Sequence, residues 1–226
     1  MIMPPRPKVT REEVLNAAYE IADEIGADAI SAREVGGRLG VTTSPVFTYY
    51  SNMEELKREV YLLAKNNFIE YLLGCKDFKP AFKEFGMRWF RFSVSHPNLY
   101  CLILESGNLY GTERNSILKD FGAIVPPLVK EIEDSFGLNA KDSEELLRQM
   151  VLTIVGIVAL HLHRGMSATE DEVSGLISEA CLGTVFAMQV SEGNFDEKKA
   201  QVMLKAVGNM PKKINKKKGD NCEGVR

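Results

Sequence analysis

A short stretch between Gly40 and Tyr50 carries the polar side chains best suited to contact another molecule. Small hydroxyls and backbone N–H groups at the start of a helix suit the phosphate oxygens and base edges of DNA. An aromatic ring at Phe47 could also contact the methyl group of a thymine. The hydroxyl-bearing side chains of this stretch are Thr42, Thr43, Ser44, Thr48 and Tyr49.

The same stretch lacks long polar side chains. No Arg, Lys, Asn or Gln lies between Thr42 and Tyr50, so the bidentate contacts that read guanine or adenine strongly are missing. Sequence specificity would then depend on Arg33, on the basic residues near the start of the chain, or on DNA shape.

Two short predicted helices position these side chains. Ser31 can cap the first helix, with Glu34 three residues later, and Gly40 ends it because glycine adopts the left-handed conformation without steric cost. Thr42 is the candidate cap of the second helix, which makes Pro45 the third helical residue, where its missing N–H costs little. The pattern of helix, glycine turn and helix predicts a helix-turn-helix.

The residues around this turn resemble a known family. The runs L-G-V-T over residues 39–42 and V-F-T-Y-Y-S-N-M-E-E-L over residues 46–56 are similar to the signature of TetR-type transcriptional repressors. The resemblance covers about residues 10–63. Phe47 and Met53 stand where that family commonly has tyrosine and lysine, so a phenolic hydroxyl and an ammonium are absent. The residues that the resemblance assigns to DNA are Arg33, Thr42, Thr43, Ser44, Phe47, Thr48, Tyr49 and Lys57.

Net charge gives little support for nucleic-acid binding. The chain of 226 residues has 28 Lys and Arg against 31 Asp and Glu, a net charge of −3. Residues 1–65 hold eight basic and ten acidic residues, which gives −2. A small DNA-facing surface therefore requires segregated charge, and the basic residues do lie near the expected footprint. They are Arg6, Lys8, Arg11, Arg33, Lys57 and Arg58.

Signals for other classes of protein are missing. The sequence contains no GxGxxG, Walker, HExxH or GxSxG motif, so an enzyme is not expected, and no cofactor or metal is predicted. His161 and His163 are two residues apart and lie on different faces of a helix, so they cannot share one metal ion. The four cysteines are scattered. No run of 18 apolar residues and no signal peptide is present, which predicts a cytoplasmic protein without a membrane helix.

The body of the chain begins with an aromatic stripe. Large aromatic residues recur at helical spacing from Phe78 to Phe92, and the helix should stop before Pro97. This stripe is either plain core or one wall of an effector pocket. The candidate pocket residues are Trp89, Phe92, His96, Tyr100, Leu104, Met150, Ile154 and His161.

Two long helices, over about residues 143–164 and 169–191, are apolar nearly all round. Such helices must be covered on every side, which favours a subunit interface. In the family that the chain resembles, the last two long helices form a four-helix interface with a second copy. The candidate interface residues are Val158, Leu162, Leu176, Ala180, Gly183 and Ala187.

These observations predict an all-α protein with a three-helix helix-turn-helix head and a larger helical domain. The expected boundaries are 1–65 for the DNA-binding head, with its motif at 31–50, 66–192 for ligand binding and dimerisation, and 193–226 for a C-terminal helix and basic tail. The resemblance implies a homodimeric regulator, mostly a repressor, which binds an operator in double-stranded DNA and an unknown small effector. The alternative from another class is a helical ligand-binding or interaction protein whose DNA-binding motif is weak or lost.

Overall fold

The computed structural model describes residues 9–77, 79–106, 122, 124–163, 165, 167–191, 196, 198 and 202. Every regular element in these ranges is a helix, which confirms the predicted all-α class. The C-terminal helix and basic tail predicted within residues 193–226 fall outside the described residues, apart from 196, 198 and 202.

The head consists of α1 (Arg11–Glu24), a 3-10 turn (Ala27–Ala29), α2 (Ala32–Leu39) and α3 (Ser44–Tyr49). Thr10 and Glu13 form the capping box that starts α1, and the Ser31 hydroxyl accepts the backbone N–H of Glu34 at 3.2 Å to start α2. Gly40 ends α2 with φ of 65°, the left-handed conformation that the sequence required. The predicted helix-turn-helix outline is therefore present.

The start of α3 differs from the prediction. Thr43, not Thr42, occupies the cap position, and Pro45 is the second helical residue rather than the third. Thr43 makes no side-chain cap, because its backbone carbonyl accepts the Val46 N–H at 3.1 Å and Pro45 has no N–H to donate. The Thr42 side chain is therefore exposed to solvent without a capping role.

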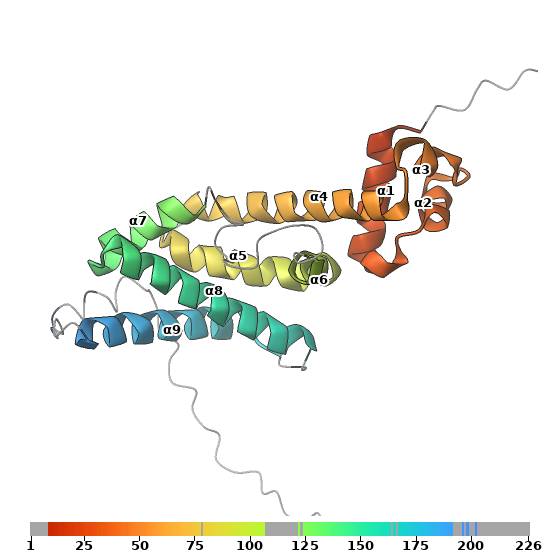
Figure 1. The fold of residues 1–226 in the computed structure, drawn as a ribbon. Coiled ribbons are helices and arrows are strands. Elements are labelled where there is room, and N and C mark those ends of the chain that lie inside the picture. Colours follow the sequence, from red (N-terminus) through yellow and green to blue (C-terminus); the bar gives the residue numbers. More distant parts are fainter. Residues whose placement is uncertain are drawn as a thin grey trace, which may run out of the picture.

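A single long helix joins the head to the body. α4 (Met53–Leu73) begins where the Asn52 side chain accepts the Glu55 N–H at 2.9 Å, and a 3-10 turn (Gly74–Asp77) follows it. Figure 1 shows α4 running from the head, at the right, along the length of the body. The helix is continuous through residue 65, so the predicted domain boundary falls inside an unbroken element.

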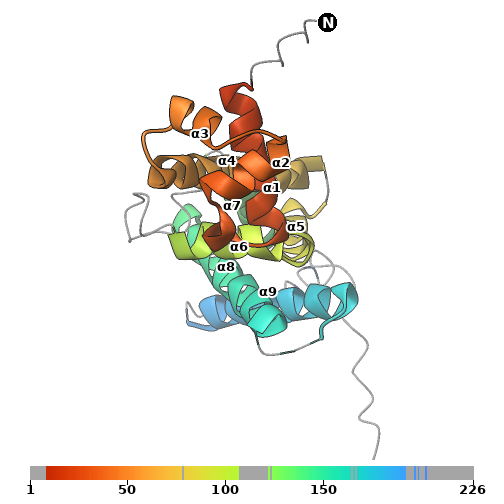
Figure 2. The same cartoon turned by 90° about the vertical axis from the view of Figure 1, so that its right-hand side faces the viewer.

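The body contains α5 (Ala81–Ser95), α6 (Pro97–Ser106), α7 (Val125–Phe136), α8 (Ala140–His163) and α9 (Glu170–Ser191). Pro97 ends α5 and begins α6, as its fixed φ requires. Pro126 and Pro127 lie in the first turn of α7, where prolines are tolerated. Figures 1 and 2 show α8 and α9 stacked on the side of α5 that faces away from α4.

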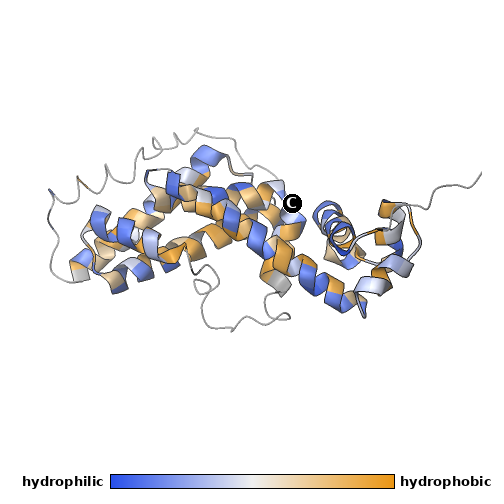
Figure 3. Ribbon diagram, turned by 90° about the horizontal axis from the view of Figure 1, so that it is seen from above, coloured by the Kyte–Doolittle hydropathy of each residue, from blue (hydrophilic) through white to orange (hydrophobic). Residues whose placement is uncertain are grey.

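Helix α5 is the centre of the body and packs against α4, α6, α7, α8 and α9. Its first turn is held by Glu131 of α7, whose carboxylate accepts the backbone N–H groups of Ala81 and Phe82 at 3.0 and 2.9 Å. This contact supplies the cap that Pro80 cannot provide. Figure 3 shows the hydrophobic and hydrophilic faces alternating along these helices.

Helices α8 and α9 are long and apolar enough to span a membrane, by length and composition alone. Buried helices in the core of a protein pass the same test. Here α8 packs against α5, α7 and α9, and α9 packs against α5 and α8, so protein covers one side of each helix.

Candidate nucleic-acid interface

The turn between α2 and α3 is packed tightly against α2. The Val41 N–H donates to the Gly36 carbonyl at 2.9 Å. A Cβ on Gly36 would lie 3.0 Å from the carbonyl oxygens of both Val41 and Thr42, whereas a Cβ on Gly37 would meet nothing within 4 Å. Gly36 therefore allows the close approach that fixes the angle between the two helices of the motif.

The outer face of α3 is free of packing. Val46 and Tyr50 anchor the helix in the head core, with at most 1% of their surface exposed. Phe47 lies on the opposite face and is 55% exposed. The exposed polar residues beside it are Thr42, Thr43, Ser44 and Thr48. This face has the composition expected for contact with phosphates and thymine methyl groups.

Two of the predicted DNA contacts already have partners within the protein. The Thr48 hydroxyl donates to the Ser44 carbonyl at 3.0 Å, which leaves its oxygen free only to accept. The Tyr49 hydroxyl donates to the Val9 carbonyl at 2.9 Å and is part-buried. The hydroxyl proton of Tyr49 is thus used inside the head, and a contact of Tyr49 with DNA stays a prediction.

Cations near α3 fall into two groups. Arg33 is exposed and makes no ion pair within the described part of the chain. The Nζ atom of Lys57 lies 4.0 Å from the Oε1 atom of Glu54. Arg11 pairs instead with Glu59 of α4, and Arg38 pairs with Glu20 of α1. The hydrogen bonds of Arg38 to Glu24 and Glu20 raise the pKa of its guanidinium further above the usual value. Arg58 of α4 is likewise exposed without an ion pair among the described residues, so Arg33, Lys57 and Arg58 are the candidate cations for phosphate contact.

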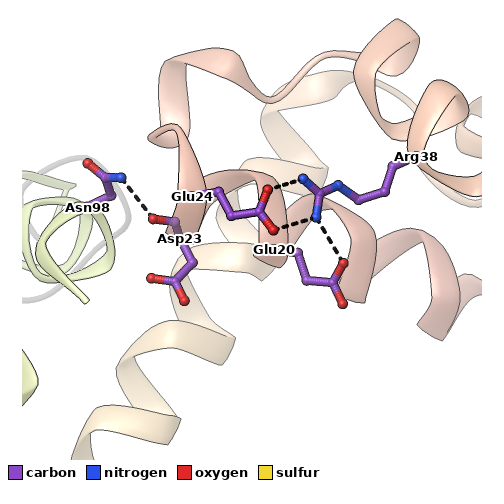
Figure 4. A network of polar contacts seen from close by, with 5 residues as sticks. All are labelled: Glu20, Asp23, Glu24, Arg38 and Asn98. Carbon is purple, nitrogen blue, oxygen red and sulfur yellow. Dashed lines mark hydrogen bonds and ion pairs between the residues drawn. The ribbon is translucent and has the colours of Figure 1, made fainter. Parts of the chain in front are cut away.

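Figure 4 shows polar contacts of α1 with Arg38 inside the head and, separately, with Asn98 of the body; the second of these is part of a joint between head and body. Arg38 of α2 donates to Glu24 at 2.9 Å and to Glu20 at 3.1 Å, both on α1. From the other side, the Asn98 side chain of α6 donates to the Asp23 carbonyl at 2.8 Å. Sequence reasoning missed this joint, because its partners are up to 75 residues apart.

His96 also belongs to this joint. Its Nδ1 lies 2.9 Å from the Asp23 carboxylate, and its ring packs on Phe92 with centroids 5.1 Å apart. The sequence placed His96 in an effector pocket, and that role stays a prediction. In the structure this ring nitrogen already has a partner on α1.

The other predicted pocket residues are mostly in the core. Trp89 is fully buried and donates its indole N–H to the Tyr100 hydroxyl at 3.1 Å. Phe68 of α4 packs edge-on against both rings. Burial raises the pKa of Tyr100 to about 12, so its hydroxyl stays protonated. Leu104 is exposed, whereas the buried residues of the set are Trp89, Phe92, Tyr100, Met150 and Ile154.

His161 differs from these residues. Its Nδ1 is buried and has no hydrogen-bond partner in the described chain, and its ring packs edge-on against Phe90 of α5 with centroids 5.3 Å apart. Buried polar atoms are nearly always paired. An unpaired ring nitrogen at the α5–α8 contact is therefore a candidate group for binding a small molecule.

The uncovered faces of α8 and α9 are apolar. Leu176 is 43% exposed, Gly183 and Ala187 are exposed at helical spacing from it, and Ala180 is half-buried on the same face. Of the other predicted interface residues, Leu162 packs partly against the core. Val158 is completely buried in its own protomer, so it has no surface to offer a partner.

Comparisons with known proteins agree with this architecture. The structure superimposes on the crystal structure of a TetR-family transcriptional regulator from Streptomyces coelicolor, with a TM-score of 0.58 and 13% sequence identity over 87% of each chain. The two chains share a fold. No family model and no curated protein sequence matches this chain. At this identity the likeness establishes the fold alone.

Proposed function

We propose that this protein is a ligand-responsive transcriptional repressor that binds a palindromic DNA operator as a homodimer in the cytoplasm. The observation that carries the proposal is the exposed face of α3, which Val46 and Tyr50 hold outward at the end of a helix-turn-helix. The shared fold with a TetR-family regulator supports the same reading. In this reading α3 lies in the major groove and Arg33 and Lys57 contact phosphates.

The uncovered faces of α8 and α9 supply the dimer contact in this proposal. Leu176, Gly183 and Ala187 on α9 would pack against the same residues of a second copy, because a two-fold axis pairs identical surfaces. Small residues at Gly183 and Ala187 permit close approach of two helices. A dimer places its two heads on DNA half-sites that are about 34–36 Å apart, a separation equal to one helical turn of DNA.

The effector in this proposal binds inside the body, next to His161. A small molecule with a hydrogen-bonding group would satisfy the unpaired Nδ1 and lie against Phe90. It releases DNA only to the extent that it binds one arrangement of the heads better than the other. The joint of Asp23 with His96 and Asn98 offers a route from the body to α1, in addition to the direct connection along α4.

The alternative is a helical ligand-binding protein that no longer binds DNA, which the net charge of −2 in residues 1–65 favours. Replacing Arg33 with Ala separates the two functions. We expect Arg33→Ala to weaken binding to the operator and to lower the salt dependence of log K by about one unit, since one phosphate contact is lost.

The matched control is Lys141→Ala, which removes the same charge from an exposed site at the start of α8 in the body. It should leave DNA affinity unchanged, and both variants should keep the oligomeric state of the parent. Equal affinity of the parent and Arg33→Ala for an operator would exclude Arg33 as a phosphate contact, whereas failure of the parent to prefer any DNA sequence would favour the alternative.

A further inference from the structure

A chain of ion pairs crosses the body from α9 to α4. Arg91 of α5 donates to the Glu170 carboxylate of α9 at 2.9 Å and to the Glu84 carboxylate of α5 at 2.9 Å. The same Oε1 atom of Glu84 lies 3.3 Å from Nε of Arg88, one helical turn further along α5. Because α4 and α9 lie on opposite sides of α5 (Figure 1), these charges connect the two outer helices through the central one.

Arg88 ends this chain of charges at the last turn of α4. Its guanidinium donates to the Tyr71 carbonyl at 3.0 Å and lies over the Tyr71 ring, 5.1 Å from the centroid. Carbonyl groups in the last turn of a helix lack helical N–H partners, and the helix dipole attracts cations there. Only 19% of the Arg88 side chain and 14% of the Glu84 side chain are exposed, so solvent screens this pair less than a surface pair.

The residue that follows α4 leaves room for this contact. A Cβ on Gly74 would lie 2.6 Å from Nη1 of Arg88 and 2.9 Å from its Cζ. Gly74 has a φ of −63°, which any residue can adopt, so the backbone conformation does not require glycine. Glycine at this position instead allows the Arg88 guanidinium to approach the end of α4.

Apolar contacts also join α4 to α5, but they constrain α4 differently. Phe68 of α4 packs against Trp89 and Phe92 of α5, with ring centroids 5.1 and 4.7 Å apart. Hydrophobic burial is non-directional, so packed helices can still slide by small amounts past each other. A guanidinium donates hydrogen bonds in fixed directions. The Arg88 contact therefore defines the position of the end of α4 more narrowly than the apolar packing does.

The position of that end matters because α4 carries the head at its other end. The 21 residues of α4 span about 31 Å, so a tilt of about 6° at the body end displaces the head end by about 3.3 Å. This displacement is close to the rise of one DNA base pair, about 3.4 Å. In the proposed dimer, the orientation of α4 relative to α9 thus decides how far apart the two heads lie.

We propose that Arg88 is a positioning residue that fixes the spacing between the two half-sites of the operator, by holding the end of α4 in one place relative to α5 and α9. Arg91 and Glu170 extend this hold to α9, the helix that faces the second copy in the proposed dimer. The inference rests on the proposed DNA-binding function. It assigns part of the operator specificity to a residue at the opposite end of α4 from the head.

The test begins with selection of DNA sites for the full-length protein from random sequence. Affinity is then measured for the selected palindrome, for versions with one base pair inserted or removed at its centre, and for a single half-site. One inserted base pair separates the half-sites by about 3.4 Å more and rotates one relative to the other by about 35°. The parent should lose about tenfold in affinity on this change, because the DNA or the protein must deform.

Two variants weaken the hold in different ways. Arg88→Met removes the guanidinium and keeps an unbranched side chain in α5, whereas Gly74→Ala keeps every charge and displaces the guanidinium from α4. Both should bind the single half-site as the parent does and lose at most about threefold on the spacing change. The control is Lys130→Met on α7, which removes a cation paired with Glu133 and Asp134 of its own helix. This control should keep the tenfold loss of the parent.

The outcomes separate this inference from the function on which it rests. A tenfold loss in either Arg88→Met or Gly74→Ala, with normal binding to the half-site, would refute the positioning role of Arg88 and leave the regulator intact. Equal tolerance in Lys130→Met would also refute it, since loss of any cation would then suffice. Failure to enrich a palindrome would refute the proposed function, and this inference with it.

Discussion

The adjacent glycines of α2 provide a matched pair of substitutions with opposite expected results. Both lie in one helix, where alanine is favoured over glycine by about 1 kcal/mol. A Cβ at Gly37 meets nothing within 4 Å, so Gly37→Ala should stabilise the head by up to about 1 kcal/mol. A Cβ at Gly36 lies 3.0 Å from the Val41 and Thr42 carbonyl oxygens. Overpacking of this kind costs about 1–3 kcal/mol, which offsets or exceeds the gain in helix propensity.

We therefore expect Gly36→Ala to be about 1–3 kcal/mol less stable than Gly37→Ala. Amide hydrogen exchange over residues 31–50 measures this difference locally, and a peptide from α8 serves as an internal reference that neither substitution should alter. Gly36→Ala should also weaken DNA binding, because the turn that carries Thr42 must move. Equal protection of residues 31–50 in the two variants would show that the turn does not constrain Gly36.

Three further predictions concern the body. Leu176→Glu should convert a dimer into a monomer, as measured by sedimentation. Leu62→Glu on α4 is the control and should leave the dimer intact, because the exposed fraction of Leu62 is 42% and that of Leu176 is 43%. A dimer that survives Leu176→Glu would place the interface elsewhere. His161→Phe removes the buried, unpaired Nδ1, so it should raise the midpoint temperature of thermal unfolding. The same substitution should abolish effector-induced release of DNA. A normal effector response would exclude His161 from the proposed effector site. Burial raises the pKa of Cys75 to about 11 and of Cys181 to about 12, so both thiols stay protonated at pH 8. Both should therefore resist labelling by maleimide until urea unfolds the protein. Detection of either labelled cysteine in the native protein by peptide mass spectrometry would contradict this prediction.

Local signals in the sequence were sufficient for most helix starts and ends. Ser31 and Gly40 act within three or four residues of themselves, and the structure confirms both of these helix ends. Thr42 was the wrong cap because α3 begins one residue later than predicted, with Thr43 at the cap position and its backbone carbonyl accepting the Val46 N–H. Which of the adjacent residues Thr42 and Thr43 occupies the cap position of α3 depends on backbone geometry, and residue types alone do not reveal that geometry.

The long-range polar contacts could not be predicted from the sequence. Tyr49 and Val9 are 40 residues apart, and His96 and Asp23 are 73 residues apart. No periodicity links such residues, since each pair depends on how separate helices dock. The helical stripe around Trp89 was predicted correctly as apolar, but only the structure shows that its indole is satisfied by Tyr100. Likewise, only the structure shows that the Nδ1 atom of His161 is buried and has no hydrogen-bond partner in the described chain.

The most direct test of DNA binding uses the purified protein and DNA from immediately upstream of its own gene, at near-physiological salt with excess unrelated DNA. The proposed function predicts a retarded complex that survives the competitor and contains two protomers per site. Binding that disappears with competitor or with modest salt reflects phosphate attraction alone. That result, followed by a random-sequence selection that enriches no site, would contradict the function proposed for the exposed face of α3.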